Sequence, residues 1–343
     1  MDLKEFDYHL EKKLIAQEPI EPKDRCRLLI LKRNSQTIEH KYFYQIIDYL
    51  SKNDVLVLNN TKVIPAKLIG QINNRQKEIL LVEPKNRNQT FSKWPNQWKV
   101  LGKKLKKGQI FTFSQHLTGV IIEKNGYEAI IKFNQKGQKL KELIFNLGKP
   151  PLPPYIKEPT TKSFFSYQTV YAKKLGSIAA PTAGFHFTKE LLSKIKKKGV
   201  EIIFITLHVG LGTFLPIKTG KIEEHKMEKE YFILTPKQTK RLNEAKKNKK
   251  RIIAVGTTVV RTLETCAKNA ILVPQQGYTD LFIYPGYKFK FVDALITNFH
   301  LPKSTPLLLV CAFASKDLIF KAYQEAQKLK YHFYSFGDAM FII

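Results

Sequence analysis

The stretch VEIIFITLHVG, Val200 to Gly210, decides the fold class of this chain of 343 residues. It is an almost unbroken apolar run that ends in a histidine and a glycine. Such runs are typical of a strand that is buried on both faces, as in a parallel sheet covered by helices. A helix is predicted directly before it, with Thr188 as its N-cap and Gly199 as its stop. This part of the chain therefore predicts an α/β fold.

The same alternation of strands and helices continues on both sides of this stretch. Further strands are predicted at CRLLIL (Cys26 to Leu31), DVLVLNN (Asp54 to Asn60), RIIAVG (Arg251 to Gly256), LFIYPG (Leu281 to Gly286) and DALITNFHLP (Asp293 to Pro302). Helices are predicted from Thr235-Pro236, at TTVVRTLETCA, and twice near the C-terminus.

A block of different character interrupts the α/β pattern. It contains the short β-like runs AKLIGQI, EILLVE, WKVLG, QIFTF and GVIIEKNGYEAIIKF, the last with Asn125-Gly126 as a hairpin signal. Several short strands at close spacing indicate a small barrel. The proline segment GKPPLPPYIKEP then marks the point where the chain leaves this block and resumes the α/β pattern. We expect a discontinuous α/β catalytic domain, 1–65 and 150–343, with a small β-barrel domain, 66–149, inserted into it.

Composition excludes several classes of protein. No apolar run approaches the ~20 residues that span a bilayer. The start, MDLKEFDYHLEKK, has no apolar h-region of a signal peptide. The three cysteines, Cys26, Cys266 and Cys311, are far apart, which argues against disulfides and thiolate metal sites. A cytoplasmic protein without a membrane partner is expected, and nothing calls for more than a monomer.

The net charge of +29 points to a polyanionic partner, because basic side chains neutralise phosphates and release counterions. However, only eight of the 58 basic residues are Arg, the usual bidentate reader of phosphate. A lysine-rich composition with solvated faces is therefore the alternative explanation of the charge.

Three histidines are predicted to follow strands: His186 in IAAPTAGFHF, His208 in ITLHVGLGTF and His300 in LITNFHLPKST. Ligands of open α/β sheets bind beyond the carboxyl ends of the strands, so these side chains could form a site there. Each could also be a structural residue. A zinc site is disfavoured, because no His-Glu-x-x-His motif, cysteine pair or short histidine spacing is present.

Two glycine-rich turns could bind an anion. Gly210 and Gly212 give only part of a dinucleotide fingerprint. In VGTTVVR, a strand leads through Gly256 into a helix N-terminus, which favours an anion or carboxylate. The alternative is that Thr257 or Thr258 merely caps this helix. No Gly-x-Ser-x-Gly elbow of a serine hydrolase is present.

Recognition of a family narrows these possibilities. In order along the chain stand LIAQEP, CRLLIL, VLNNTKVIPAKL, PPLPPYI, YQTVYA, IAAPTAGFHF, TLHVGLGTF, EEHKMEKEY, AVGTTVVRTLE, FIYPGY, DALITNFHLPKST and FGDAMFI. Together they resemble the S-adenosylmethionine:tRNA ribosyltransferase-isomerases of queuosine biosynthesis, from Leu14 to the C-terminus. The family usually has Leu where this chain has Phe185. The family fold, a larger α/β domain with a small inserted β-barrel, agrees with the prediction above.

The resemblance implies a defined reaction. Such enzymes transfer and isomerise the ribosyl moiety of S-adenosylmethionine onto a 7-aminomethyl-7-deazaguanine at the wobble position of a tRNA with a GUN-type anticodon. The product is epoxyqueuosine-tRNA, and adenine and methionine are released. S-adenosylmethionine is consumed as a cosubstrate, so no cofactor and no metal are expected.

This chemistry needs a base for the ribose C5′ proton, an acid for the leaving adenine, and donors that stabilise oxygen. His186 is the first choice for the base, because Phe185 and Phe187 would exclude water and keep its imidazole neutral. His208 and His300 are expected to protonate adenine or hold ribose hydroxyls. Arg261 could pair with the methionine carboxylate or bridge to Glu264. The expected substrate-binding residues are Thr182, Gly184, Gly210, Gly212, Thr213, Thr257, Thr258, Arg261, Asn298 and Asp338.

Two other functions remain open from the sequence. One is an S-adenosylmethionine-dependent tRNA methyltransferase, although the usual acidic-Gly-x-Gly-x-Gly strand and loop is missing. The other is a non-catalytic RNA-binding protein, which would need no clustered histidines.

Overall fold

A computed structural model of the chain describes residues 1–86, 93–157, 160, 164, 166–210, 212 and 217–343. The chain divides into two compact units. One unit consists of 1–61, 154–173 and 181–343, and the other of 62–153 and 174–180. The sequence did not predict that the chain enters the smaller unit a second time, at 174–180. This second entry arises because β11 (Lys174–Ser177) pairs with β4 (Thr61–Val63).

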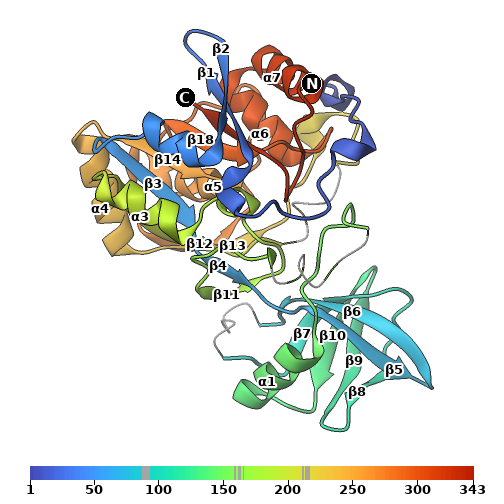
Figure 1. Ribbon diagram of the computed structural model, residues 1–343. Helices are drawn as coiled ribbons and strands as arrows, with labels where there is room; N and C mark the ends of the chain where they lie inside the picture. Colours follow the sequence, from blue (N-terminus) through green and yellow to red (C-terminus); the bar gives the residue numbers. More distant parts are fainter. Residues whose placement is uncertain (87–92, 158–159, 161–163, 165, 211, 213–216) are drawn as a thin grey trace. The chain divides into compact units, whose positions relative to one another are not determined.

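The larger unit is built on one mixed sheet (Figure 1). Among the described residues, nine strands form it in the order β17-β13-β12-β3-β14-β18-β19-β1-β2. In this order the strands are Gln275–Thr279, Glu230–Leu234, Glu201–Leu207, Asp54–Asn59, Arg251–Val255, Ala294–Asn298, Ala339–Ile342, Arg27–Lys32 and Thr37–Tyr42. The central strands β12, β3, β14 and β18 are parallel to one another. The predicted buried parallel strands and α/β class are confirmed.

Helices cover both faces of this sheet. The α-helices are α3 (Lys189–Lys197), α4 (Pro236–Lys247), α5 (Thr257–Cys266), α6 (Thr305–Ala314) and α7 (Lys316–Lys328). The 3-10 helices are η1 (Leu3–Phe6), η2 (Lys12–Leu14), η3 (Lys23–Arg25), η4 (Phe43–Tyr49), η5 (Thr182–Gly184) and η7 (Ile222–Glu224). Thr188 caps α3 as predicted, because its side chain accepts a hydrogen bond from the N–H of Leu191.

Side-chain alternation in the strands separates the two faces. Leu56 and Leu58 of β3 pack in one core with residues of α3 and η4. Asn59, the next residue, points to the other face, where its amide contacts Thr258 of α5. A single strand therefore supports a helix layer on each side.

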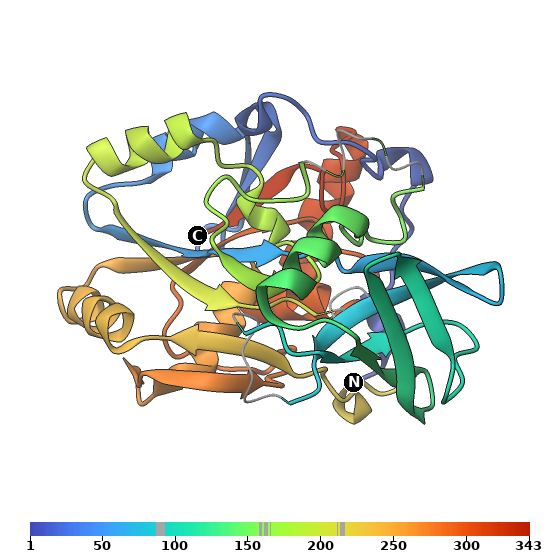
Figure 2. The ribbon, with the colours of Figure 1, turned by 90° about the horizontal axis from the view of Figure 1, so that it is seen from below.

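The smaller unit is a closed barrel in the strand order β10-β7-β6-β5-β8-β9. Its strands are β5 (Lys67–Ile72), β6 (Arg75–Pro84), β7 (Gln97–Leu101), β8 (Ile110–Ser114), β9 (Leu117–Asn125) and β10 (Glu128–Phe133). The predicted hairpin forms, with Gly126 at φ +55° between paired Asn125 and Glu128. Helix α1 (Gly137–Leu147), which was not predicted, lies beside these strands (Figures 1 and 2) and packs Leu140 and Ile144 into the barrel core.

The prediction of a strand at Leu281 to Gly286 is wrong, because these residues form no regular structure. The physical reason is that a side chain takes a main-chain partner there: the carbonyl of Leu281 accepts a hydrogen bond from Nε of Arg261 at 3.0 Å. Nearby, the short strands β15 (Ala267–Lys268) and β16 (Ile271–Leu272) pair with each other in antiparallel orientation. Within the described residues, no helix is long and apolar enough to cross a membrane.

Candidate active site

Polar residues gather at one edge of the large sheet. The parallel strands β12, β3, β14 and β18 all end there, so His208, Asn59, Thr257 and Asn298 lie at or just beyond this edge. Strand β19 runs opposite to β18 and begins at the same edge, which brings Asp338 there. This is the position at which open α/β sheets bind ligands.

His186 lies in the turn between η5 and α3 and is only 3% exposed. Its Nδ1 is 3.1 Å from Sγ of Cys26, and its Nε2 is 3.1 Å from Nδ2 of Asn298. Burial, with a smaller effect of Lys23, lowers the pKa of His186 to about 3. The imidazole is therefore neutral at pH 7, as the two flanking phenylalanines led us to expect.

Asn298 determines which nitrogen of His186 carries the proton. Its Nδ2 also donates to the carbonyl of Tyr334 at 3.0 Å, and its Oδ1 accepts from the hydroxyl of Thr182 at 3.1 Å. A carbonyl can only accept, so the amide orientation is fixed. Nε2 of His186 must then accept from Asn298, and its ring proton lies on Nδ1 toward Cys26. The structure thus brings Thr182, His186 and Asn298 together.

His208 lies directly after β12 and is half-buried. Its Nδ1 is 2.8 Å from Oγ1 of Thr61, and its ring lies parallel to that of Tyr231, with centroids 6.1 Å apart. Burial lowers the pKa of His208 to about 4. Like His186, it is a neutral imidazole at pH 7.

His300 lies two residues beyond β18, and burial lowers its pKa to about 3. Its Nε2 is 2.8 Å from Oγ1 of Thr297, while its N–H and carbonyl are held by the hydroxyls of Tyr323 and Tyr8. Thr297 precedes Asn298 in the strand, and successive side chains point to opposite faces. His300 and His186 therefore lie on opposite faces of β18, at one edge but with different partners.

A small pocket lies at the N-terminus of α5. Most of its lining is apolar, with three threonines and one arginine: Met227, Thr257, Thr258, Arg261, Leu281, Phe282, Ile283, Thr305, Pro306 and Leu309. Three of the expected substrate-binding residues, Thr257, Thr258 and Arg261, thus share one cavity. The helix N-terminus beside them favours a group with hydrogen-bond acceptors.

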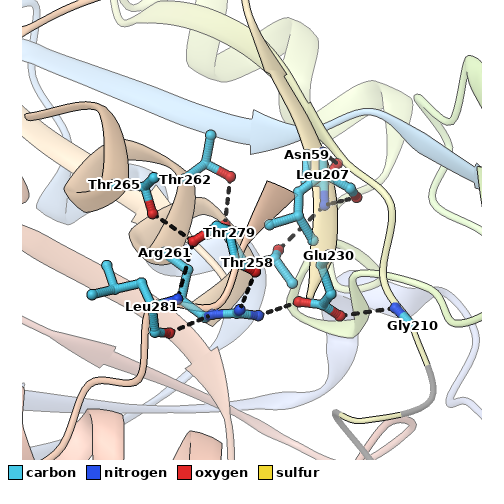
Figure 3. A network of polar contacts seen from close by, with 10 residues as sticks. All are labelled: Asn59, Leu207, Gly210, Glu230, Thr258, Arg261, Thr262, Thr265, Thr279 and Leu281. Carbon is cyan, nitrogen blue, oxygen red and sulfur yellow. Dashed lines mark hydrogen bonds and ion pairs between the residues drawn. The ribbon is translucent and has the colours of Figure 1, made fainter. Parts of the chain in front are cut away.

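A buried ion pair lies at this pocket (Figure 3). Arg261 binds Glu230 through Nη1, while its other nitrogens donate to the carbonyls of Leu281 and Thr279 at 3.0 and 3.2 Å. The second carboxylate oxygen of Glu230 accepts the N–H of Gly210 at 2.8 Å. Glu230 therefore joins the glycine turn after β12 to the pocket wall, and it balances the charge of Arg261.

Two local expectations around α5 are wrong. Arg261 does not bridge to Glu264, whose carboxylate instead accepts the backbone N–H groups of Lys290, Phe291 and Val292 at 2.8 to 3.1 Å. Neither threonine is the N-cap of α5. The cap is Gly256 at φ +90°, a conformation that glycine adopts without strain.

The remaining predicted glycines sit where the backbone is crowded. A Cβ on Gly184 would lie 2.0 Å from the hydroxyl of Tyr171, and a Cβ on Gly212 would lie 2.5 Å from Cβ of Glu228. The hydroxyls of Tyr171 and Thr169, both beside Gly184, are buried and have no hydrogen-bond partner among the described residues.

Asp338 is held away from solvent at the start of β19. Its carboxylate accepts the N–H groups of Arg27 and His332, each at 2.7 Å. Burial raises its pKa, and these hydrogen bonds and the charge of Arg27 oppose that rise. Asp338 thus ties β1 to the C-terminal segment. Thr213, the last of the expected residues, lies outside the described part of the chain.

Three residues of this edge were missed by sequence reasoning: Asn59, Thr61 and Glu230. Asn59 bridges β3 to the carbonyl of Leu207 at 2.9 Å and to Oγ1 of Thr258 at 3.3 Å. The signal for it was present, because a buried apolar strand that ends in Asn places amides at the carboxyl edge. Among the described residues, no group of three His, Cys, Asp or Glu side chains is placed to hold a metal ion.

Comparison with known proteins agrees with this architecture. A family model described as "Queuosine biosynthesis protein" matches residues 3–342. Proteins named S-adenosylmethionine:tRNA ribosyltransferase-isomerase from Sulfurihydrogenibium sp. (strain YO3AOP1) and Thermotoga petrophila are 51% and 49% identical, with both chains covered in full. The crystal structure of S-adenosylmethionine tRNA ribosyltransferase from Thermotoga maritima has 40% identity and a TM-score of 0.56, covering 99% of this chain and 100% of that one. The chain belongs to the S-adenosylmethionine:tRNA ribosyltransferase-isomerase family of queuosine biosynthesis proteins.

Proposed function

We propose that this protein transfers and isomerises the ribosyl moiety of S-adenosylmethionine onto the 7-aminomethyl-7-deazaguanine at the wobble position of a tRNA with a GUN-type anticodon. Epoxyqueuosine-tRNA forms, and adenine and methionine leave. The observation that carries this proposal is the match of the whole chain to a family named for this activity. S-adenosylmethionine acts as a cosubstrate, without a cofactor or metal, and the working unit is a monomer.

The proton transfers are assigned to the histidines of the sheet edge. His186 is the proposed base, with Nε2 as the accepting atom, because its tautomer leaves the lone pair there. Asn298 donates a hydrogen bond to that lone pair. This hydrogen bond must therefore break before Nε2 can accept the ribose C5′ proton. Burial keeps this base unprotonated at pH 7, but a pKa of about 3 also makes it weak, so the acidity of the C5′ proton beside the sulfonium has to drive the transfer.

The same depressed pKa values change the expected source of the acid. His208 and His300 were the candidates for protonating the departing adenine, which would require a charged imidazolium, but burial lowers the pKa of His208 to about 4 and that of His300 to about 3. A resident imidazolium is therefore disfavoured at pH 7. We propose that the proton taken from C5′ is passed on to adenine, which needs no acid charged beforehand. Thr257 and Thr258 supply hydroxyls to substrate oxygen at the α5 pocket.

The test is incubation with S-adenosylmethionine and tRNA that carries the deazaguanine precursor, followed by mass spectrometry of the nucleosides. Epoxyqueuosine and free adenine are expected in equal amounts. S-adenosylhomocysteine instead of adenine would indicate a methyltransferase. RNA binding without any binding of S-adenosylmethionine in calorimetry would indicate a non-catalytic protein.

A further inference from the structure

Two exposed tyrosines, Tyr42 and Tyr44, lie parallel to each other on the surface of the larger unit. Their ring centroids are 5.9 Å apart and their planes differ by 7°. They are 49% and 36% exposed, and tyrosine is a residue type that is enriched at binding interfaces. The guanidinium of exposed Arg25 lies over the Tyr44 ring, 5.0 Å from its centroid. We refer to Tyr42, Tyr44 and Arg25 as the Tyr–Arg platform.

The platform is held in place by its backbone. Tyr42 pairs with Arg27 in the β1–β2 ladder, and its N–H donates to Oε1 of Gln45 at 2.9 Å. Phe43, between the two tyrosines, is fully buried, and its N–H donates to the carbonyl of Cys26 at 2.8 Å. The two rings are thus presented by an ordered segment, which reduces the entropy that a partner must overcome on binding.

The platform lies at the same sheet edge as the candidate active site. The ring of Phe43 is 5.1 Å from that of His186, centroid to centroid. Asn298 pairs with Ala339, Ala339 with Leu28, and Leu28 with Lys41, the neighbour of Tyr42. At about 4.8 Å per strand, three strand spacings put the platform roughly 15 Å from Asn298.

Basic side chains adjoin the platform. Lys41 directly precedes Tyr42 in β2, and Lys23 and Arg25 belong to η3, which packs against η4, the helix that carries Tyr44. The exposed lysines at the end of α3 lie at the opposite edge of the sheet, because that helix leads into the start of β12. An aromatic pair with an arginine and neighbouring lysines, in a chain of net charge +29, matches a ligand that combines flat bases with phosphates.

We propose that the Tyr–Arg platform stacks unpaired bases of the RNA substrate that neighbour the nucleotide being modified. This inference rests on the proposed function and identifies a second contact for its RNA. Single-stranded loops are recognised by stacking of splayed bases on aromatic rings and arginine planes, whereas paired bases offer no free face. The partner is therefore a loop and not a duplex.

The experiment compares Tyr42→Ala/Tyr44→Ala with the matched control Tyr42→Phe/Tyr44→Phe. Fluorescence anisotropy measures binding of a labelled anticodon stem-loop and of a duplex of the same stem without the loop. Replacing a stacked aromatic residue by alanine typically weakens binding by about 5- to 150-fold per base. The alanine pair should therefore weaken stem-loop binding by at least about fivefold. Duplex binding, and the affinity of the phenylalanine pair for the stem-loop, should stay within about twofold of the original protein.

Arg25→Ala serves as a second variant, because it removes the cation and leaves both tyrosine rings in place. It should weaken stem-loop binding more than duplex binding. Unchanged stem-loop affinity in the alanine variants, or an equal loss on stem-loop and duplex, would overturn the inference. If the original protein makes no epoxyqueuosine but the alanine variants still lose stem-loop binding selectively, the proposed function fails while the platform stands.

Discussion

Arg261 and Glu230 form an ion pair whose side chains are only 6% and 2% exposed, although 31 residues separate them in the chain. A charge buried at this depth is expensive unless it is paired, and each partner here is also hydrogen-bonded to main-chain groups. The pair therefore holds α5, β13 and the glycine turn after β12 in one arrangement around the α5 pocket.

Glu230→Gln should destabilise the protein strongly, because it leaves the Arg261 charge buried without a counter-charge. Loss of one partner of a buried pair costs about 3–5 kcal/mol. Urea unfolding gives the change in the free energy of unfolding. The control is Glu201→Gln, which breaks the more exposed pairs with Arg241 and Lys250 and should cost about 1 kcal/mol or less per pair. Equal losses in the two variants would contradict this account of the pair.

Gly184→Ala should lower the melting temperature, since its Cβ would fall 2.0 Å from the Tyr171 hydroxyl and 2.9 Å from Cγ2 of Thr169. Overpacking of this kind costs about 1–3 kcal/mol. Tyr171→Phe removes a hydroxyl that has no hydrogen-bond partner among the described residues, so it should be nearly neutral alone and should rescue part of the loss in Gly184→Ala. Gly220→Ala is the matched control, because no atom of the described residues lies within 4 Å of the added Cβ.

Stability should fall as the pH drops below about 6.5, before the carboxylates begin to titrate. In the folded chain burial lowers the pKa of His186 and His300 to about 3 and that of His208 to about 4, so only the unfolded chain takes up these protons. Each histidine then contributes a slope of up to about 1.4 kcal/mol per pH unit, with stability present above pH 6.5 and lost on acidification.

Urea unfolding between pH 7.5 and 5 measures that slope. His300→Gln should reduce it, whereas His116→Gln, at an exposed position of the barrel unit, should leave it unchanged. A slope that is the same in all three proteins would show that the buried histidines do not set the acid sensitivity.

His186→Gln should fold and bind S-adenosylmethionine but lose turnover by roughly 10²–10⁴, the usual effect of removing a general base. Circular dichroism, calorimetry and nucleoside mass spectrometry follow the three properties separately. Cys26→Ala is the comparison, because it removes the neighbour of Nδ1 and leaves Nε2 in place. Turnover of His186→Gln within about tenfold of the original protein would assign His186 to orienting Asn298 instead.

Binding of tRNA should weaken steeply with salt, because a chain of net charge +29 meets a polyanion. The logarithm of the affinity should fall with the logarithm of salt concentration at a slope of about −0.9 per phosphate neutralised on duplex stems. Binding of S-adenosylmethionine, measured over the same range, should change little. A flat profile for tRNA would mean that the lysines reflect composition and not RNA recognition.

Much of the fold could be predicted because it depends on local periodicity. The continuous apolar run at 200–207 reports burial on both faces, and it became β12 in the middle of the sheet. The alternation around Asn125-Gly126 reports a hairpin, and it became β9 and β10 of the barrel. Each of these patterns can be recognised within about ten residues of sequence. The strand or hairpin can therefore be predicted without knowing which distant residues it will contact.

The tertiary structure alone decided which polar groups meet. Glu264, at i+3, was the natural partner for Arg261 in sequence, yet the order β12-β13 places Glu230 there instead. His186 and His300 both follow strand-like segments, but their neighbours Asn298 and Thr297 point to opposite faces of one strand. Partners of this kind depend on strand order, register and the face on which a side chain emerges, and these are set only when segments far apart in the chain pack together.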